Sequence, residues 1–361
     1  MAKKLMKGSE VLGASAIKAG CLNFFGYPIT PQNEVPEYMA KELPKIPGGN
    51  FVQAESEVAA INMVYGSAAS GARCMTSSSS PGIALKQEGI AYCCGAELPC
   101  VIGSVSRGGP GLGGIQPSQG DYFQATRGGG NGDYHVIVYA PSTLQELSDL
   151  TQKAFYIADK YRNPVMILID GAVAQMMEGV EIKDFDFPEV DKSKWAIVGK
   201  QGGPKHRVIT SMYLNTDELE AINTRFQDKY DEITENEKDA ELYMVDDAEF
   251  VIAAYGTSAR IVRNSINDLR KKGIKIGLIR PITLWPFPDY AFEKIPDTCK
   301  GIMVLELSKG QMIQDVKLAL NGRFKDIGFY GRTGGNIFDS NEARDAIEKY
   351  IKEKSILEVI K

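Results

Sequence analysis

The sequence is poor in the residues from which most metal and cluster sites are built. Only two histidines are present, His135 and His206, and none of the six cysteines forms a Cys-x-x-Cys pair. This spacing does not suit a zinc site or an iron–sulfur cluster, and two histidines offer little to a metal site or a charge-relay triad. We therefore expect buried free thiols, two ordinary structural or surface histidines, and no metal ligand on this chain.

Motifs for nucleotides, membranes and nucleic acids are also missing. The glycine-rich segments 108–114 and 128–130 lack the strand–turn–helix context of G-x-G-x-x-G, and no G-x-x-x-x-G-K-S/T occurs. The basic start Met1-Ala-Lys-Lys-Leu5 is not followed by an apolar signal segment, and no membrane span is visible. A net charge of −5 argues against nucleic acid or an anionic membrane as the main partner. We expect a cytoplasmic protein that binds neither nucleic acid nor a membrane.

The first half of the chain has the alternating pattern of an α/β protein. At 361 residues the chain is long enough for two domains with cores of their own. The run 164–170 is continuously apolar, which suits a buried parallel strand. We expect strands at 22–25, 72–76, 99–105, 136–139 and 164–170, a loop at 77–81, and helices at 8–20, 58–70, 82–95 and 142–161. This pattern predicts a doubly wound α/β domain.

The second half begins with an irregular, charged region and then returns to α/β patterning. Apolar residues recur at helical spacing over 216–240, which predicts an amphipathic connecting helix; they are Leu219, Ile222, Phe226, Tyr230 and Ile233. We expect this apolar stripe to pack against the rest of the protein and not to form a binding site. A second run follows, with strands expected at 250–255, 274–279 and 302–307, a turn at 256–258 and a helix ending near 272. We expect domains at 1–185 and 246–361, joined by a charged linker at 186–245.

A turn held by two prolines follows the first predicted strand. In Tyr27-Pro28-Ile29-Thr30-Pro31 the prolines fix their own φ and restrict the residues before them, so the Thr30 hydroxyl is held on a stiff backbone. Further on, Glu55-Ser-Glu57 opens the helix predicted at 58–70. Negative charge in a first helical turn stabilises by about 0.3–1 kcal/mol, so spacing alone leaves a structural role open for both glutamates.

Together these motifs resemble the α-type subunit of 2-oxoacid:ferredoxin oxidoreductases, a family of thiamine-diphosphate enzymes. The order of the motifs is shared over most of the first 180 residues. They are Tyr27-Pro-Ile-Thr-Pro31, Glu55-Ser-Glu57, Ser79-Ser-Pro-Gly82 and Ser106-Arg-Gly-Gly-Pro-Gly111, while Gln116-Pro-Ser-Gln119 and Tyr122-Phe-Gln-Ala-Thr-Arg127 resemble the 2-oxoisovalerate branch. The resemblance implies a doubly wound, pyrimidine-type thiamine-diphosphate domain followed by an α/β domain similar to the C-terminal domain of transketolase.

The resemblance also implies that thiamine diphosphate and Mg²⁺ are held mainly by a β-type partner subunit. Family members that bind the diphosphate and metal use a motif that begins with Gly-Asp-Gly and ends with an Asn pair. The segment Gly132-Asp133-Tyr134 does not match this motif. This chain would instead supply the pyrimidine side of the cofactor, through Tyr27, Pro28, Ile29 and Glu57. Iron–sulfur clusters would lie on γ-type and ferredoxin-like δ-type subunits, and none on this chain.

Within that site the resemblance gives Glu57 a catalytic role. Thiamine catalysis needs the aminopyrimidine in its imino tautomer, which removes the thiazolium C2 proton, and a carboxyl group hydrogen-bonded to the ring nitrogen stabilises this tautomer. Relative to Gly66 and Gly71, Glu57 holds the position of the family glutamate, and Glu55 is left as a dipole partner. Without the resemblance, the sequence does not distinguish the two acids.

Arg107 and Thr30 are the expected contacts of the substrate carboxylate. Arg107 offers a planar fork of donors and Thr30 a hydroxyl, and in the family the matching residues contact this carboxylate. The sequence alone favours a surface arginine on a flexible glycine loop, because arginine is usually exposed. The resemblance reverses that preference.

The implied reaction converts a branched-chain 2-oxoacid, coenzyme A and oxidised ferredoxin into acyl-coenzyme A, carbon dioxide and reduced ferredoxin. One alternative is the 2-oxoglutarate enzyme, although its arginine loop usually continues Ser-Thr-Gly where this chain has Gly111-Leu112-Gly113. Another is a non-catalytic scaffold with a degenerate thiamine fold, in line with the missing diphosphate motif. The preferred acyl chain, the stoichiometry, the coenzyme A site and the ferredoxin contact stay open.

Overall fold

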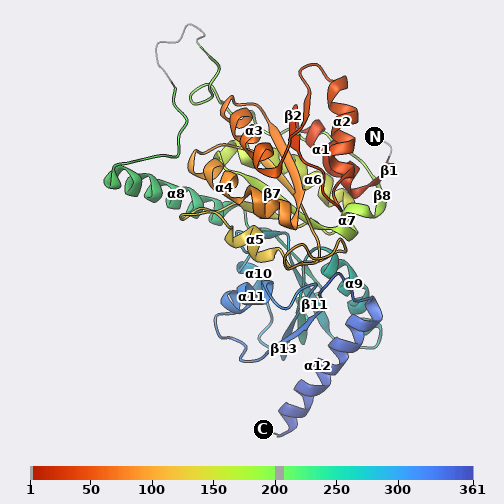
Figure 1. Ribbon diagram of the computed structural model, residues 1–361. Coiled ribbons are helices and arrows are strands. Elements are labelled where there is room, and N and C mark those ends of the chain that lie inside the picture. Colours follow the sequence, from red (N-terminus) through yellow and green to blue (C-terminus); the bar gives the residue numbers. More distant parts are fainter. Residues whose placement is uncertain (1–2, 200–206, 361) are drawn as a thin grey trace.

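The protein is built on two large β-sheets, one from each half of the chain, with a small two-stranded ribbon beside the first (Figure 1). The structure is a computed structural model that describes residues 3–199 and 207–360. His206 lies outside these residues. In Figure 1 the first sheet and its helices form the upper part, and the second sheet forms the lower part together with the long C-terminal helix α12 (Ser340–Ile360).

The first sheet has seven strands, and six of them run parallel. Their order is β12 (Thr283–Trp285), β6 (Ile137–Tyr139), β7 (Val165–Asp170), β5 (Val101–Ser106), β4 (Cys74–Ser79), β2 (Asn23–Gly26) and β3 (Asn50–Gln53). Only β12 pairs antiparallel, with β6. The chain leaves β2 for one edge and then returns to build the other side from β4, which is the doubly wound arrangement predicted from the sequence.

Helices cover both faces of this sheet. On one face lie α1 (Gly8–Lys18), α2 (Glu34–Glu42) with the short 3₁₀ turn η1 (Leu43–Lys45), and α6 (Leu144–Tyr161); on the other lie α3 (Glu57–Ala69) and α4 (Ser80–Gly95). Strand β7 shows why both faces are apolar. Val165 and Ile167 pack in the core under α1, α2 and α6, whereas Met166 packs in the core under α3 and α4. Successive side chains of a strand point to opposite faces, so a strand buried on both reads as a continuous apolar run.

The second sheet has five strands in the order β14 (Ile327–Gly331), β13 (Gly301–Glu306), β10 (Phe250–Ala253), β11 (Ile276–Pro281) and β9 (Ala240–Tyr243). All neighbours are parallel except β9, which runs antiparallel to β11. Helices α9 (Gly256–Lys271) and α12 pack on one face. The other face, with α10 (Tyr290–Glu293) and α11 (Met312–Leu320), is continuous with the core under α3 and α4, so the two halves share one apolar interior.

The remaining elements connect these layers. They are β1 (Lys4–Lys7) paired with β8 (Met177–Val180), α5 (Tyr122–Arg127), α7 (Gly171–Gln175) and α8 (Thr216–Asn236). Helix α8 confirms the amphipathic connecting helix, because Phe226, Tyr230 and Ile233 are buried in the core of the first sheet. The stripe packs as expected at these residues, whereas Leu219 at its start is 39% exposed.

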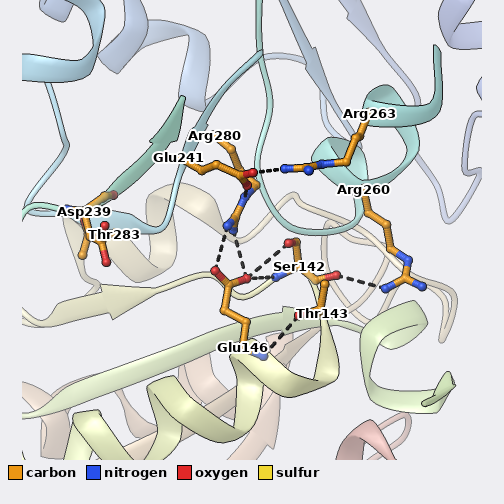
Figure 2. A network of polar contacts seen from close by, with 9 residues as sticks. All are labelled: Ser142, Thr143, Glu146, Asp239, Glu241, Arg260, Arg263, Arg280 and Thr283. Atoms are coloured by element: carbon orange, nitrogen blue, oxygen red, sulfur yellow. Dashed lines mark hydrogen bonds and ion pairs between the residues drawn. The ribbon is translucent and has the colours of Figure 1, made fainter. Parts of the chain in front are cut away.

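Polar contacts tie the second sheet to the first (Figure 2). Arg280 on β11 donates from both terminal nitrogens to the carboxylate of Glu146 on α6, over 2.8 and 3.0 Å, and from Nε to Glu241 on β9 over 2.8 Å. Arg263 on α9 also binds Glu241. Two-pronged arginine–carboxylate contacts are strong and directional, so this network fixes the orientation of α6 against the second half.

A second tie runs through Gln119, which is buried. Its amide oxygen accepts hydrogen bonds from the Ser258 hydroxyl at 2.6 Å and from the Leu307 nitrogen at 2.9 Å, and its amide nitrogen donates to the Tyr255 carbonyl at 2.9 Å. The Gln119 backbone nitrogen donates to the Leu307 carbonyl. One side chain thus meets backbone or hydroxyl groups at the ends of β10 and β13, and both polar atoms of the buried amide have hydrogen-bond partners.

Most helices and strands lie where the sequence predicts them, with two corrections. The loop expected at 77–81 was wrong, because β4 continues to Ser79 and α4 begins at Ser80. Serine is common in turns, but here Ser77 and Ser78 donate to Gln32 and Glu57, and these tertiary partners satisfy their hydroxyls inside a buried strand. The turn expected at 256–258 was also wrong, since α9 begins at Gly256.

The cysteines and His135 behave as the sequence suggested. All six cysteines are free and buried, and burial raises the pKa of the Cys21 thiol to about 12. His135 is a structural residue: its ring stacks on Trp285 with 4.4 Å between centroids and meets Tyr230 edge-on. Burial lowers the pKa of His135, which favours a neutral imidazole in this aromatic cluster. No helix among the described residues is long and apolar enough to cross a membrane.

Candidate active site

The predicted site residues gather at the carboxyl edge of the first sheet. The turn 27–31 follows β2, Glu57 opens the helix after β3, the serines 77–80 end β4, and Arg107 follows β5. The direction of winding reverses between β2 and β4, and in open α/β sheets such a point leaves a crevice outside the carboxyl ends of the strands. The topology therefore brings together residues from four separate strands.

The proline turn is exposed on its outer side and anchored from within. Tyr27 and Thr30 are exposed, whereas Ile29 is half-buried. Gln32, fully buried, donates from its amide to the Tyr27 carbonyl at 3.3 Å and accepts the Ser77 hydroxyl at 2.5 Å. The turn is thereby fastened to β4, and the Thr30 hydroxyl faces the outside with only a long contact to Asn33 at 3.4 Å.

Arg107 is buried beneath the glycine-rich loop, with only 7% of its surface exposed. Its Nη1 donates to the Thr30 carbonyl oxygen at 2.8 Å and its Nη2 to the Leu112 carbonyl oxygen at 3.1 Å. Its backbone nitrogen donates to Ser80 Oγ at 2.9 Å, while Nε has no partner among the described residues. Arg107 is thus not a mobile surface arginine, and the structure joins it to Thr30 through the Thr30 backbone.

The glycine-rich loop is closed on itself. The Gly108 nitrogen donates to the Gln116 carbonyl, and the Gly114 nitrogen donates to the Gly108 carbonyl. At Gly113 φ is +56°, and a Cβ atom there would lie 1.9 Å from the Gly108 oxygen, so only glycine fits. Leu112, at 82% exposure, projects from the tip. The loop forms a tight cover over Arg107 that carries an apolar tip outward.

A groove of about 580 Å³ runs beside Thr30. Its walls come from the proline turn, the start of α2, the end of the glycine-rich loop and α7. The lining includes Thr30, Glu34, Ile115, Gln116, Pro117 and Gln175. The groove gives a small polar molecule a route towards the Thr30 hydroxyl along the edge of the sheet.

Glu57 is the first residue of α3 and is almost fully buried, at 3% exposure. Ser56 caps the helix by accepting the Ala59 nitrogen at 3.1 Å. Glu57 Oε1 accepts the Ser78 hydroxyl at 2.5 Å, and Oε2 forms an ion pair with Lys86 Nζ on α4. Gly82 makes room for this contact, because a Cβ there would lie 2.3 Å from Glu57 Oε1. Glu55, by contrast, is exposed.

A second carboxyl group lies on the other side of the serine run. Asp121 Oδ2 accepts the Ser80 hydroxyl at 2.5 Å. Burial raises the pKa of Asp121, and the hydrogen bonds and the charge of Arg107 oppose that rise. Ser80 thereby links Asp121 to the backbone of Arg107, and the buried edge of the sheet has one carboxyl group near each of its two cationic side chains.

The residues present fit the pyrimidine half of thiamine diphosphate. That half needs a carboxyl group sheltered from water to face its ring nitrogen, and Glu57 is such a group. The hydroxyls of Thr76 and Ser79 on β4 and of Ser104 on β5 are buried and have no partner in the part of the chain that the structure describes. Among the described residues, no three His, Cys, Asp or Glu side chains come together as a metal site would require.

Sequence reasoning missed Lys86, Ser78 and Asp121. The clue for Lys86 lies in its spacing, because it follows Ile83 by three positions and precedes Ile90 by four, which places a charged residue within the buried stripe of α4. Asp121 follows the motif ending at Gln119, but nothing in its neighbourhood distinguishes it from a loop aspartate. The Ser78 contact depends on tertiary structure alone.

Comparison with known families and structures agrees with the thiamine-diphosphate fold that the sequence motifs predict. Residues 14–248 match the family model described as pyruvate flavodoxin/ferredoxin oxidoreductase, thiamine diphosphate-binding, and residues 248–343 match the pyruvate:ferredoxin oxidoreductase core domain II. A split-gene transketolase, solved as an inactive beta4 tetramer, aligns over 95% of this chain with a TM-score of 0.57 at 12% identity and shares the fold alone. The transketolase-like α/β architecture predicted from the sequence is confirmed.

Individual relatives indicate which branch of the family this chain resembles. The ketoisovalerate oxidoreductase subunit VorB of Methanothermobacter thermautotrophicus is 47% identical over 97% of both chains, and the 2-oxoglutarate synthase subunit KorA of Methanocaldococcus jannaschii is 35% identical over 96% of this chain and 100% of its own. The 2-oxoglutarate:ferredoxin oxidoreductase of Magnetococcus marinus, solved with 2-oxoglutarate, coenzyme A and succinyl-CoA bound, aligns with a TM-score of 0.83 at 27% identity. This alignment covers 96% of our chain and 65% of that one, so our chain spans less than two thirds of its length. The chain belongs to the thiamine-diphosphate-binding 2-oxoacid:ferredoxin oxidoreductase family as an α-type subunit, as its motifs predicted.

Proposed function

We propose that the chain is the α-type subunit of an oxidoreductase that acts on branched-chain 2-oxoacids of the 2-oxoisovalerate type. The observation that carries this proposal is the 47% identity, over 97% of both chains, to a relative named as a ketoisovalerate oxidoreductase subunit. The reaction takes the 2-oxoacid, coenzyme A and oxidised ferredoxin to acyl-coenzyme A, carbon dioxide and reduced ferredoxin. When bound, thiamine diphosphate supplies the stabilised carbanion that such a decarboxylation requires.

Arg107 and Thr30 are the proposed receptors of the substrate carboxylate. A guanidinium group has five N–H donors, and contacts to the Thr30 and Leu112 carbonyls use one from each terminal nitrogen. The remaining donors are held on a side chain that two backbone anchors keep in place. Such a preorganised donor recognises a carboxylate with little loss of conformational entropy on binding. The exposed Thr30 hydroxyl adds a neutral donor at the mouth of the groove.

Glu57, with Tyr27, Pro28 and Ile29, is proposed to meet the pyrimidine side of the cofactor. The support is that the half-buried Ile29 and the buried Glu57 follow neighbouring strands, which places an apolar surface and a carboxyl group at one end of the sheet. An apolar wall excludes water, and in a water-poor site a carboxylate interacts more strongly with a ring nitrogen than it would in bulk solvent. Glu57 is the group that shares a proton with that nitrogen.

A β-type partner subunit is proposed to hold the diphosphate and Mg²⁺. Its support is the exposed apolar side chains on the two helices that carry Glu57 and Lys86: Val58 on α3 is 44% exposed, and Leu85 and Tyr92 on α4 are 59% and 41% exposed. Large exposed apolar side chains gathered near a functional site are typical of protein interfaces. We place the iron–sulfur clusters on γ-type and ferredoxin-like δ-type subunits, and the complex in the cytoplasm, where free thiols such as the six here stay reduced.

The division into domains at 1–185 and 246–361, with a connecting segment at 186–245, is kept as a proposal. The two sheets support it in the main, since six strands of the first lie before residue 171 and four strands of the second lie after residue 249. Strand β9 lies inside the proposed connecting segment yet belongs to the second sheet, and β12 lies in the second half yet pairs with β6.

The 2-oxoglutarate enzyme is the alternative substrate class. It is favoured by the KorA relative and by the solved 2-oxoglutarate enzyme, both at lower identity than VorB. The apolar loop tip at Leu112 argues against it, because a second substrate carboxylate calls for a polar or cationic partner. A non-catalytic scaffold is the alternative from another class, and the missing diphosphate motif is its only support.

One experiment separates these possibilities. A tagged chain is purified with its native partner subunits, and ferredoxin reduction is measured with coenzyme A and 2-oxoisovalerate, pyruvate or 2-oxoglutarate, with and without thiamine diphosphate. We expect cofactor-dependent reduction with the highest kcat/KM for 2-oxoisovalerate. A preference for 2-oxoglutarate would establish the alternative substrate class. A complex that reduces ferredoxin with none of the three would identify the chain as a scaffold.

A further inference from the structure

A lysine is completely buried behind the candidate site. The side chain of Lys86 has no exposed surface, and its ammonium group forms an ion pair with Glu57 Oε2. On α4 it shares a face with Ile83 and Ile90, which are both buried. A buried ammonium costs several kcal/mol of hydration free energy, which a partner charge must offset. The sequence has therefore placed a cation where the helix otherwise carries apolar side chains.

The surroundings of this ion pair are nearly free of other charge. Glu57 is the one charged group that acts on Lys86 among the described residues: burial lowers the pKa of Lys86, and the charge of Glu57 opposes that change. The other oxygen of Glu57 accepts the neutral Ser78 hydroxyl from β4. Gly82 adds no side chain. Lys86 is therefore the cation that contacts Glu57, which also lies in the first turn of α3, near the positive end of that helix.

Stability alone is a poor reason for such a pair. Replacing a buried ion pair by apolar residues of similar size is often neutral or stabilising, because desolvation of two charges cancels their attraction. Leu or Met at position 86 would continue the apolar stripe of α4. A role in controlling Glu57 explains why a lysine is found there.

We propose that Lys86 is a positioning residue that holds Glu57 as a carboxylate, so that the proton shared with the facing pyrimidine nitrogen stays on that nitrogen. This inference rests on the proposed function. A carboxylate can only accept a hydrogen bond, whereas a neutral carboxylic acid would donate its own proton to the ring. The ammonium of Lys86 favours the first arrangement by its charge. The two arrangements differ in the position of one proton, which would lie on the ring nitrogen when Glu57 is a carboxylate and on Glu57 Oε when Glu57 is a neutral acid.

The direct test reads the protonation of Glu57 rather than turnover. In the complex isolated through the tagged chain, infrared difference spectra against Glu57→Gln identify the Glu57 band at neutral pH. We expect a carboxylate band in the parent protein, a carboxylic acid band in Lys86→Met, whose unbranched side chain is one atom shorter, and a carboxylate band again in Lys86→Arg. Lys86→Gln, a smaller neutral variant, is the second case if Lys86→Met does not fold. Loss of the carboxylate band in either neutral variant supports the proposal.

A second readout follows the consequence for the cofactor in the same complex. The exchange rate of the thiazolium C2 proton is expected to fall on the order of tenfold or more in Lys86→Met, since acid–base assistance typically contributes at least that much, while KM for the 2-oxoacid stays within about twofold. Lys160→Met is the matched control, because it also removes a lysine from an ion pair, with Glu237, but outside the site. It is expected to leave both readouts unchanged.

The outcomes are distinct. A Glu57 carboxylate band that persists in every neutral variant that folds, Lys86→Met and Lys86→Gln, would overturn the inference, as would unchanged C2 exchange in an active complex. A complex inactive with every 2-oxoacid would instead refute the proposed function, and the infrared result would still show whether Lys86 sets the charge of Glu57.

Discussion

Arg107 donates from Nη1 to the backbone carbonyl oxygen of Thr30 over 2.8 Å, and this contact joins the ends of β5 and β2 across the intervening strand β4. The two residues are 77 positions apart in sequence. This hydrogen bond links the glycine-rich loop to the proline turn at the carboxyl edge of the first sheet. A guanidinium anchored in this way has its remaining donors fixed before a substrate arrives.

Arg107→Ala is expected to lower kcat/KM by about tenfold or more for 2-oxoisovalerate, pyruvate and 2-oxoglutarate alike. Loss of a charge-assisted hydrogen bond costs about 1.5–3 kcal/mol, and about 1.4 kcal/mol corresponds to one decade in rate. Arg107→Lys should recover only part of the loss, because an ammonium cannot replace a two-pronged contact. Thr30→Val is the milder comparison, since only a neutral donor is removed. A changed ranking of substrates with the best one spared would place Arg107 in the acyl pocket.

Glu57→Gln in the assembled complex is expected to slow exchange of the thiazolium C2 proton while assembly stays intact. An amide is a poorer proton partner for the pyrimidine nitrogen than a carboxylate. The measurement is C2 exchange by NMR after quenching. Glu55→Gln is the matched control, because Glu55 is exposed and lies two positions away. Exchange at the parental rate in Glu57→Gln would remove Glu57 from the mechanism.

The chain purified without partners is expected to be colourless and to bind thiamine diphosphate weakly. Its cysteines are free, buried thiols without a Cys-x-x-Cys pair, and it has no Gly-Asp-Gly segment to grip a diphosphate. Iron analysis and calorimetric titration with thiamine diphosphate and Mg²⁺ check both points. Stoichiometric iron, or tight cofactor binding by the chain alone, would contradict the assignment of cluster and diphosphate sites to other subunits.

Gln119→Ala is expected to destabilise the chain by about 1–3 kcal/mol, because the buried Leu307 nitrogen and Tyr255 carbonyl lose hydrogen-bond partners. Urea unfolding measures this change. Gln227→Ala is the control, since the Gln227 amide makes only an exposed contact of 3.5 Å, and we expect it to change stability little. Equal stability of the two variants would show that Gln119 does not hold the sheets together.

Asp121→Asn is expected to alter how stability depends on pH. Burial raises the pKa of Asp121 above its ordinary value of 3.8, so the folded state binds this proton more tightly than the unfolded state does. The resulting stabilisation is fully present below pH 3.8 and is lost as the pH rises through the raised value. Unfolding free energies of parent and variant, measured from acid to neutral pH, should differ most in favour of the parent at the acid end. A constant difference would show that Asp121 titrates normally.

The sequence predicted most strands of the first sheet well, because a run such as 165–170 is apolar over its first five residues, as a strand buried on both faces requires. It failed at 77–79, where polar residues continue a strand whose partners, Gln32 and Glu57, come from distant segments. Lys86 was missed for the same reason: lysine is normally solvated, and only the fold shows that its partner lies on another helix. Local patterns thus locate the elements, whereas buried polar pairs depend on tertiary contacts.

Strand β12 also affects the order in which the protein can be completed during synthesis. It pairs with β6 at the edge of the first sheet, although residues 240–281 of the second sheet precede it in the chain. A ribosome must therefore produce much of the second sheet before the first can close its edge. Until then the unpaired groups of β6 are open to other chains, and an exposed strand edge is a template for aggregation. A truncated chain that ends before residue 283 would carry that exposed edge permanently.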